Sequence, residues 1–160
     1  MDVDSLYMRM AIRQARAAAA DGEVPVGALI VHPDKGIVGK AFNQVETLHD
    51  ATAHAEILAI TQACAAVGDW RLEDCTLYVT KEPCPMCAGA IVFSRIKRVV
   101  WGLSDPARGG ESVFHILNSQ ALVHRVECVP GLMEEECRQD LVGFFRDLRA
   151  NRREQPGGGD

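Results

Sequence analysis

The chain has 160 residues, of which 48% are hydrophobic and 24% are charged. These proportions are typical of globular domains and exclude disordered and fibrous chains, and the length suffices for one domain whose core needs no disulfide or metal. The formal net charge of −5 lacks the basic excess typical of nucleic-acid-binding proteins, although a local cluster of Lys and Arg can still bind a polyanion.

The N-terminal segment MDVDSLYMRM is acidic and has no apolar stretch followed by a small-residue cleavage site, so we expect no signal peptide. The apolar runs fall far short of the roughly 18 residues that a membrane-spanning helix needs. We therefore expect a cytoplasmic protein that does not enter a membrane. Its six cysteines are then interpreted as free thiols or metal ligands, not as disulfides.

Apolar residues at helical spacing alternate along the chain with short β-rich segments that are bounded by turn residues. The sequence PDKG separates the first two β-rich segments and predicts an antiparallel hairpin, and Gly68 ends the second helical segment. The expected helices span residues 6–20, 54–68, 84–94 and 132–153, and the expected strands span residues 24–32, 36–43, 76–80, 98–103 and 123–129.

From the second strand onward the order is β-α-β-α-β, which predicts parallel strands joined by helices. Residues 104–122, with a helical pattern at 112–118, are long enough for a crossover to a fifth parallel strand. We predict an α/β fold, a three-layer α/β/α sandwich with a five-stranded mixed sheet. Residues 1–153 would form a single domain, and residues 154–160 a disordered, glycine-rich tail.

Two cysteines have the spacing of metal ligands. Cys84 and Cys87 follow the third expected strand in the segment EPCPMCAGA, so they share one face of the first turn of a helix. A helix N-terminus favours the thiolate form that binds a metal. His54 also stands at a helix start after a strand. Because loops that follow parallel strands meet at the carboxyl edge of a sheet, we expect these helix starts to be neighbours.

One imidazole and two thiolates would give zinc three protein ligands and leave a fourth position for water, the arrangement of a catalytic site. Glu56 stands two residues after His54. A regular helix would turn these side chains apart, but in an irregular first turn one can bind the metal while the other faces the water. We interpret Glu56 as a proton shuttle and not as a ligand.

Single parts of this pattern are less specific than the whole. A lone Cys-x-x-Cys also occurs in structural and redox sites. Cys75 or His49 could close a structural zinc site, although neither has the near-sequence spacing usual for such ligands. Taken together, HAE and PCPMC give H-x-E…P-C-x-x-C, the signature of zinc nucleobase deaminases.

Over residues 6–149 the chain resembles the bacterial tRNA-specific adenosine deaminases, the TadA family of the cytidine deaminase-like superfamily. Beyond the zinc motif, the resemblance rests on EVPVGALIV, TLYVT, CAGAIVFSRI, RVVWG and FFR. It implies one zinc ion per subunit, bound by His54, Cys84 and Cys87, with Glu56 as general acid and base. Zinc-bound hydroxide would attack C6 of the wobble adenosine in a tRNA anticodon loop, releasing ammonia and leaving inosine.

The resemblance also implies partners. Asn43 matches the family asparagine that contacts the target nucleotide, although an asparagine at a strand end is also a common turn residue. Family members are homodimers packed around the Cys-x-x-Cys helix and the hairpin side. Positions that the family uses around the anticodon arm are matched here by Arg95, Lys97, Arg98, Phe144, Phe145, Arg146 and Arg149. The phenylalanines would equally suit a helix core, and the arginines a solvated face.

The chain departs from the family pattern in several places, some of which fall in loops that recognise RNA. The family commonly has proline at Ala51, an apolar residue at Lys81 and asparagine at Val123, and its loop at residues 104–112 is about one residue longer. Two alternatives to tRNA deamination therefore stand: a free nucleobase deaminase for guanine or cytosine, and a non-catalytic scaffold or RNA-binding module with structural zinc. The second leaves Glu56 without a role.

Overall fold

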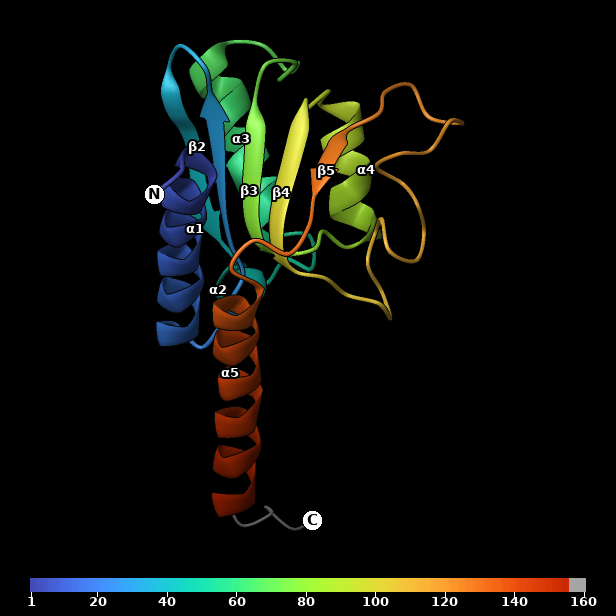
Figure 1. Ribbon diagram of the computed structural model, residues 1–160. Helices are drawn as coiled ribbons and strands as arrows, with labels where there is room; N and C mark the ends of the chain where they lie inside the picture. The colour runs from blue at the N-terminus through green and yellow to red at the C-terminus, as the bar shows by residue number, and fades with distance from the viewer. Residues whose placement is uncertain (156–160) are drawn as a thin grey trace.

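The computed structural model describes residues 1–155 and consists of five helices and one five-stranded sheet (Figure 1). In chain order the elements are α1 (Val3–Ala20), β1 (Gly27–His32), β2 (Gly36–Phe42), α2 (Val45–Leu48), α3 (Ala55–Val67), β3 (Thr76–Lys81), α4 (Pro85–Phe93), β4 (Arg98–Leu103), β5 (Glu127–Val129) and α5 (Glu134–Glu154).

The strand order is β2-β1-β3-β4-β5. Strand β1 pairs antiparallel with both β2 and β3, whereas β3–β4 and β4–β5 are parallel. Strand β2 therefore runs in the same direction as β3, with β1 inserted between them. The predicted hairpin, the mixed five-stranded sheet and the parallel fifth strand are confirmed.

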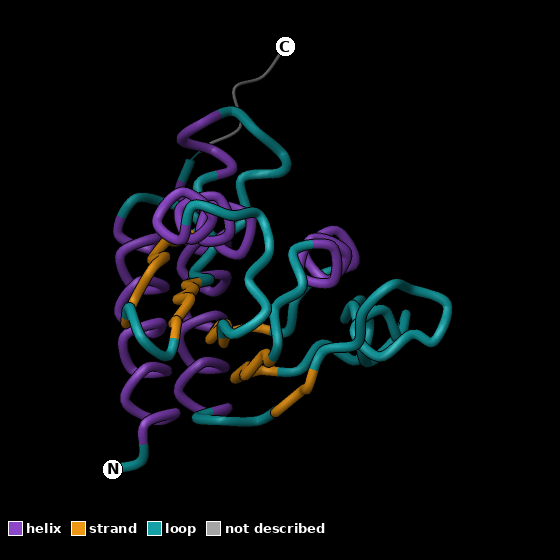
Figure 2. The backbone as a smooth tube through the Cα atoms, turned by 90° about the horizontal axis from the view of Figure 1, so that it is seen from above, coloured by secondary structure: helices purple, strands orange, loops and turns teal. Residues whose placement is uncertain are grey.

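Helices cover both faces of the sheet, which gives three layers (Figure 2). On one face, α3 and α4 pack buried alanines and branched apolar residues against alternate side chains of β1, β3 and β4. Strand β2 and helix α3 approach each other closely because Gly39 has no side chain. A Cβ on Gly39 would lie 2.4 Å from the backbone oxygen of Ala59. On the other face, α1 and the start of α5 cover Leu29, Tyr78 and Val100. The predicted α/β/α sandwich is confirmed.

Two expectations for the segment between β4 and α5 are wrong. Residues 112–118 form turns and no helix, because His115 has a left-handed backbone and the Ile116 N–H donates to Gly110 and not to a residue four positions back. The fifth strand covers only Glu127–Val129 instead of residues 123–129. The N–H of Val126 donates to the Leu117 carbonyl, so the residue directly before β5 is bonded to the loop and not to β4.

The short helix α2 was not predicted, since four residues give no measurable periodicity.

At the C-terminus α5 continues through Glu154, the first residue of the expected tail. The rest of that expectation, for residues 156–160, lies outside the described residues. Within residues 1–155 no helix is both long enough and apolar enough to cross a membrane.

The carboxyl ends of β2, β3 and β4 lie at one edge of the sheet, which we call the carboxyl edge. Helix α2 follows β2 there, and α3 and α4 begin there. The later turns of α5 extend past this edge (Figure 1). The start of β4 and the turn between β1 and β2 lie at the opposite, amino edge. The loop after β4 and the starts of α3 and α4 thus lie together at the carboxyl edge.

Candidate active site

Two helix starts at the carboxyl edge carry the residues of the predicted metal centre. His54 is the N-cap of α3 and Cys84 the N-cap of α4, and both have extended backbone. Pro85 then begins α4, with a φ angle suited to a first helical turn. Because an N-cap lies half outside its helix, the side chain of His54 is free to face the same cavity as Glu56, two residues further along. The expected irregular helix start is confirmed.

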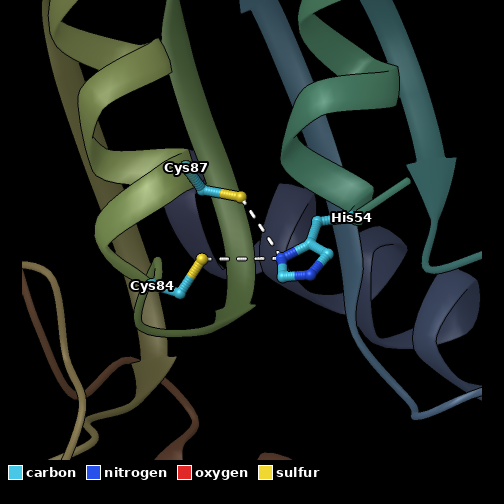
Figure 3. Close-up of side chains that lie close together, drawn as sticks. All are labelled: His54, Cys84 and Cys87. Atoms are coloured by element: carbon cyan, nitrogen blue, oxygen red, sulfur yellow. Dashed lines mark hydrogen bonds between the residues drawn. The ribbon is translucent and has the colours of Figure 1, made fainter. Parts of the chain in front are cut away.

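The side chains of His54, Cys84 and Cys87 converge (Figure 3). The Nδ1 atom of His54 lies 3.5 Å from each of the two sulfur atoms. The three ligand atoms all lie within 4.8 Å of one another. Among residues 1–155, no other group of three His, Cys, Asp or Glu side chains is arranged to hold a metal, and neither Cys75 nor His49 belongs to this group.

The two thiols differ in how easily they ionise. The pKa of Cys84 is lowered to about 4, mainly by a hydrogen bond from Cys87 and to a smaller extent by one from His54. The hydrogen bond to Cys84 and burial raise the pKa of Cys87 far above its ordinary value. A second thiolate beside the first therefore needs a divalent cation between them. One imidazole and two thiolates are the donor set that zinc favours, and they leave a fourth position open.

Glu56 lies in the first turn of α3 and is only 3% exposed. Burial is the main reason why the pKa of its carboxyl group is raised above the ordinary value, and a raised pKa suits a group that accepts and returns a proton. Its carboxylate lines a cavity together with His54 and Cys84. This placement is what a proton shuttle beside the metal requires.

The cavity has a volume of about 540 Å³, within the range of small-molecule sites. Asn43, which follows β2 and is 8% exposed, lines the same cavity. Helix α5 contributes an apolar side of the wall through Phe144, Phe145 and Leu148. The sequence alone did not show that the end of the chain would border the same space as the zinc motif.

A buried glutamate that was not predicted as a site residue shapes this cavity. Glu82, 3% exposed, accepts hydrogen bonds from the N–H groups of Asp105, Glu111 and Ser112 and from the Ser112 hydroxyl. Gly109 packs so closely on this carboxylate that a Cβ there would lie 2.0 Å from it. The loop after β4 is therefore fastened to the segment that carries Cys84. A glutamate two residues before that ligand was the only available signal.

A second buried carboxylate that lines the cavity, Glu23, plays a similar part. Glu23 accepts hydrogen bonds from the N–H groups of Glu46 and Thr47 and from the Thr47 hydroxyl. These bonds hold α2, whose residues Val45 and Glu46 line the cavity. Helix α2 and the loop after β4, which both border the cavity, are thus each held by one buried glutamate.

The predicted RNA-contacting residues fall into two separate regions. Arg95, Lys97 and Arg98 lie between α4 and the start of β4, at the amino edge, so the structure does not bring them to the cavity. There Arg98 donates to both carboxylate oxygens of Asp4. In contrast, the cavity-lining phenylalanines share their half of α5 with two exposed arginines, Arg146 and Arg149.

The comparisons with known proteins agree with this geometry. Residues 1–103 match the family model described as the cytidine and deoxycytidylate deaminase zinc-binding region. The chain is 47% identical over 154 residues to the tRNA-specific adenosine deaminase of Bacillus subtilis, covering 96% of this chain and 95% of that protein.

Two solved structures show how far the likeness extends. One, from work on A-to-I editing by tRNA:A34 deaminases at the wobble position of transfer RNA, is 41% identical with a TM-score of 0.81 and covers 85% of this chain and 99% of the other. A guanine deaminase from Bacillus subtilis is 28% identical with a TM-score of 0.61, covering 100% of this chain and 98% of the other. The chain therefore belongs to the tRNA-specific adenosine deaminase family of zinc-dependent hydrolytic deaminases.

Proposed function

We propose that the protein deaminates the wobble adenosine of a tRNA anticodon loop to inosine. The observation that carries this proposal is the likeness to a tRNA-specific adenosine deaminase along 96% of the chain. That span includes α5, whose side chains wall the cavity. The guanine deaminase shares the fold and the length but has a much lower identity. The proposed substrate also places the protein in the cytoplasm, where tRNA is found.

His54, Cys84 and Cys87 would hold the zinc ion, because their ligand atoms already converge. When bound, zinc would supply a Lewis acid that makes water a nucleophile at neutral pH. The buried Glu56 carboxylate takes a proton as the nucleophile forms and returns it to the departing amino group, so that ammonia leaves. Because Glu56 acts first as the base and then as the acid, the reaction needs no second acidic residue.

Asn43 and α5 would bind the target base. An asparagine amide both donates and accepts hydrogen bonds, so Asn43 can pair with the edge of a purine ring that enters the cavity. Phe144 and Phe145 line the same space, and aromatic rings stack on bases taken out of a helical strand. Arg146 and Arg149 follow on the same helix and would meet the phosphates of the anticodon arm.

The second basic group, Arg95, Lys97 and Arg98, would contact RNA only at a distance from the target base, since it lies at the amino edge.

A homodimer is the expected assembly. Met86 and Phe93 of α4 are exposed, and a Cβ on Gly89 between them would meet no atom within 4 Å, so this apolar helix face is uncovered. Light scattering should give twice the mass of the 17.4 kDa chain, and a monomer would contradict the assembly.

The decisive experiment measures inosine in a short anticodon stem-loop that contains a wobble adenosine, after incubation with the zinc-loaded protein. Glu56→Ala serves as the matched control, with zinc content measured in both proteins. Inosine formation by the wild type alone, with zinc retained in the variant, is expected. If the zinc-loaded wild type leaves the stem-loop unchanged but releases ammonia from free guanine or cytosine, the protein is a nucleobase deaminase and the proposal is wrong.

A further inference from the structure

The charges around the cavity are unusual for a site that must admit a polyanion. The acidic residues in its wall are Glu23, Glu46, Glu56, Glu82 and Asp105, and the Lys and Arg residues in it are Lys81 and Arg152. RNA carries one negative charge at every phosphate, so its approach to this wall requires a cation that faces the strand. Lys81 stands at the end of β3, three residues before Cys84.

Lys81 forms an ion pair with a carboxylate that is already fixed by other contacts. Its Nζ atom lies 3.3 Å from Oδ2 of Asp105. The other oxygen, Oδ1, accepts hydrogen bonds from the N–H groups of Ala107 and Arg108. The N–H of Asp105 donates in turn to Glu82 at 3.0 Å. Asp105 therefore keeps its position without help from Lys81, and the ion pair fixes the lysine rather than the loop.

The ammonium group has capacity for a further partner. A lysine carries three N–H donors, and Asp105 is the one acceptor that the structure assigns to Lys81 within residues 1–155. The lysine side chain is 36% exposed and the Asp105 side chain 18%, so the lysine is the more accessible member of the pair. Its free donors are thus available to a group that arrives from solvent at the cavity.

We propose that Lys81 is a phosphate-binding residue, which takes a phosphodiester group of the RNA strand beside the adenosine that enters the cavity. The proposal rests on the proposed function and adds a subsite to it. When a base is extruded into a cavity, its flanking phosphates stay at the entrance, and Lys81 borders the same cavity as the metal centre. An ammonium is well suited to bind such a group as a point charge.

The competing role for Lys81 is to neutralise Asp105 and nothing more. The two roles differ in what they predict for a double variant. In Lys81→Met with Asp105→Asn, both charges of the pair are removed together, so RNA binding should return to the wild-type level if neutralisation is the whole role. If Lys81 contacts a phosphate, binding stays weak, because the contact is still missing.

The test measures binding of a fluorescent anticodon stem-loop to zinc-loaded Glu56→Ala protein, in which no turnover occurs, by anisotropy at several KCl concentrations. Adding Lys81→Met should weaken binding about tenfold at low salt, as expected for one charge-assisted hydrogen bond. It should also reduce the slope of log affinity against log salt by about 0.7 to 0.9. Lys81→Arg should keep both values near those of the parent.

Lys35→Met is the matched control, since Lys35 is an exposed lysine in the turn between β1 and β2 at the amino edge, and it should change neither value. Lys81→Met with an unchanged salt slope, or full recovery in the double variant, would overturn the subsite. Inosine formation by the wild type is measured separately. If the wild type edits the stem-loop and Lys81→Met binds it normally, the subsite fails while the proposed function stands.

Discussion

One group of charged residues at each edge of the sheet shows two different uses of ionisable side chains. At the amino edge Arg98 and Asp4 are paired with each other: Arg98 donates to Asp4, which also accepts a hydrogen bond from the Tyr78 hydroxyl at 2.7 Å. At the carboxyl edge, His54 and Glu56 line a cavity of about 540 Å³. Charges that satisfy one another stabilise a fold, whereas buried ionisable groups that face a cavity are available for chemistry.

The same contrast exists within the carboxyl edge, between two glutamates that are equally buried. Glu82 accepts four hydrogen bonds from the loop that it anchors. Glu56 faces the cavity and the zinc ligands, and burial raises its pKa. Residue type and exposure are identical for the two, so the role of each carboxylate is set by the donors around it.

Loss of a thiolate should have the largest effect. In Cys84→Ala the remaining imidazole and thiolate are too few ligands for a stable zinc site, so zinc content and inosine formation should both fall below detection. Metal analysis and the stem-loop assay measure this. Cys64→Ala is the control, because Cys64 is a free, half-buried cysteine of α3 outside the metal group; if it lost zinc equally, general unfolding would explain the result.

Glu56→Gln should lower the turnover number by about 10² to 10⁴, the usual contribution of a general acid and base. Zinc content should stay at one ion per chain, because Glu56 is not in the ligand group. The assay is single-turnover inosine formation with bound zinc quantified in the same sample. Wild-type turnover in this variant would remove the proton shuttle from the mechanism and leave only the metal centre.

Glu82→Gln should show that equal burial does not mean equal chemistry. The amide offers one acceptor oxygen in place of two and directs its NH₂ toward loop donors, so unfolding free energy should fall by about 1–3 kcal/mol. The loss of loop order should raise KM for the stem-loop more than it lowers kcat, with zinc retained. Denaturant unfolding and steady-state kinetics check both. A drop in kcat as large as that of Glu56→Gln would erase the distinction between the two glutamates.

The zinc motif was readable from the sequence because helix starts after strands define where its residues meet. His54, Cys84 and Cys87 needed only the predicted β-α-β order to be placed together, and the structure brings them within 4.8 Å. The Lys81–Asp105 pair and the Glu82 anchor depend on the path of the loop after β4. That path is fixed by backbone hydrogen bonds to a side chain, which leave no periodic pattern in the sequence.

The amino edge limited prediction in a different way. The basic cluster at Arg95, Lys97 and Arg98 was grouped with α5 because the family resemblance implied RNA contacts for both, although its position after α4 and at the start of β4 places it at the amino edge. The partner of Arg98 is Asp4, 94 residues away. Long-range pairing of this kind follows from the strand order, which the sequence determines only through the complete fold.

The smallest effect is expected from breaking that pair. The hydrogen bond from Arg98 is the main reason why the pKa of Asp4 is lowered. A lowered pKa means that the pair stabilises the fold above the pKa of Asp4 in the unfolded chain, about 3.9, and that this contribution is lost as pH falls through the lower pKa of the folded state. Asp4→Asn should therefore cost about 1 kcal/mol at pH 7 and little once the pH has fallen below the pKa of Asp4 in the folded state.

Thermal unfolding of both proteins across this pH range measures the difference, and editing activity at pH 7 should not change. The reverse pH dependence, or a loss of editing with an intact fold, would mean that the amino edge takes part in function. In that case the charges at the two edges would not differ in kind, and Arg98 would need a partner beyond Asp4.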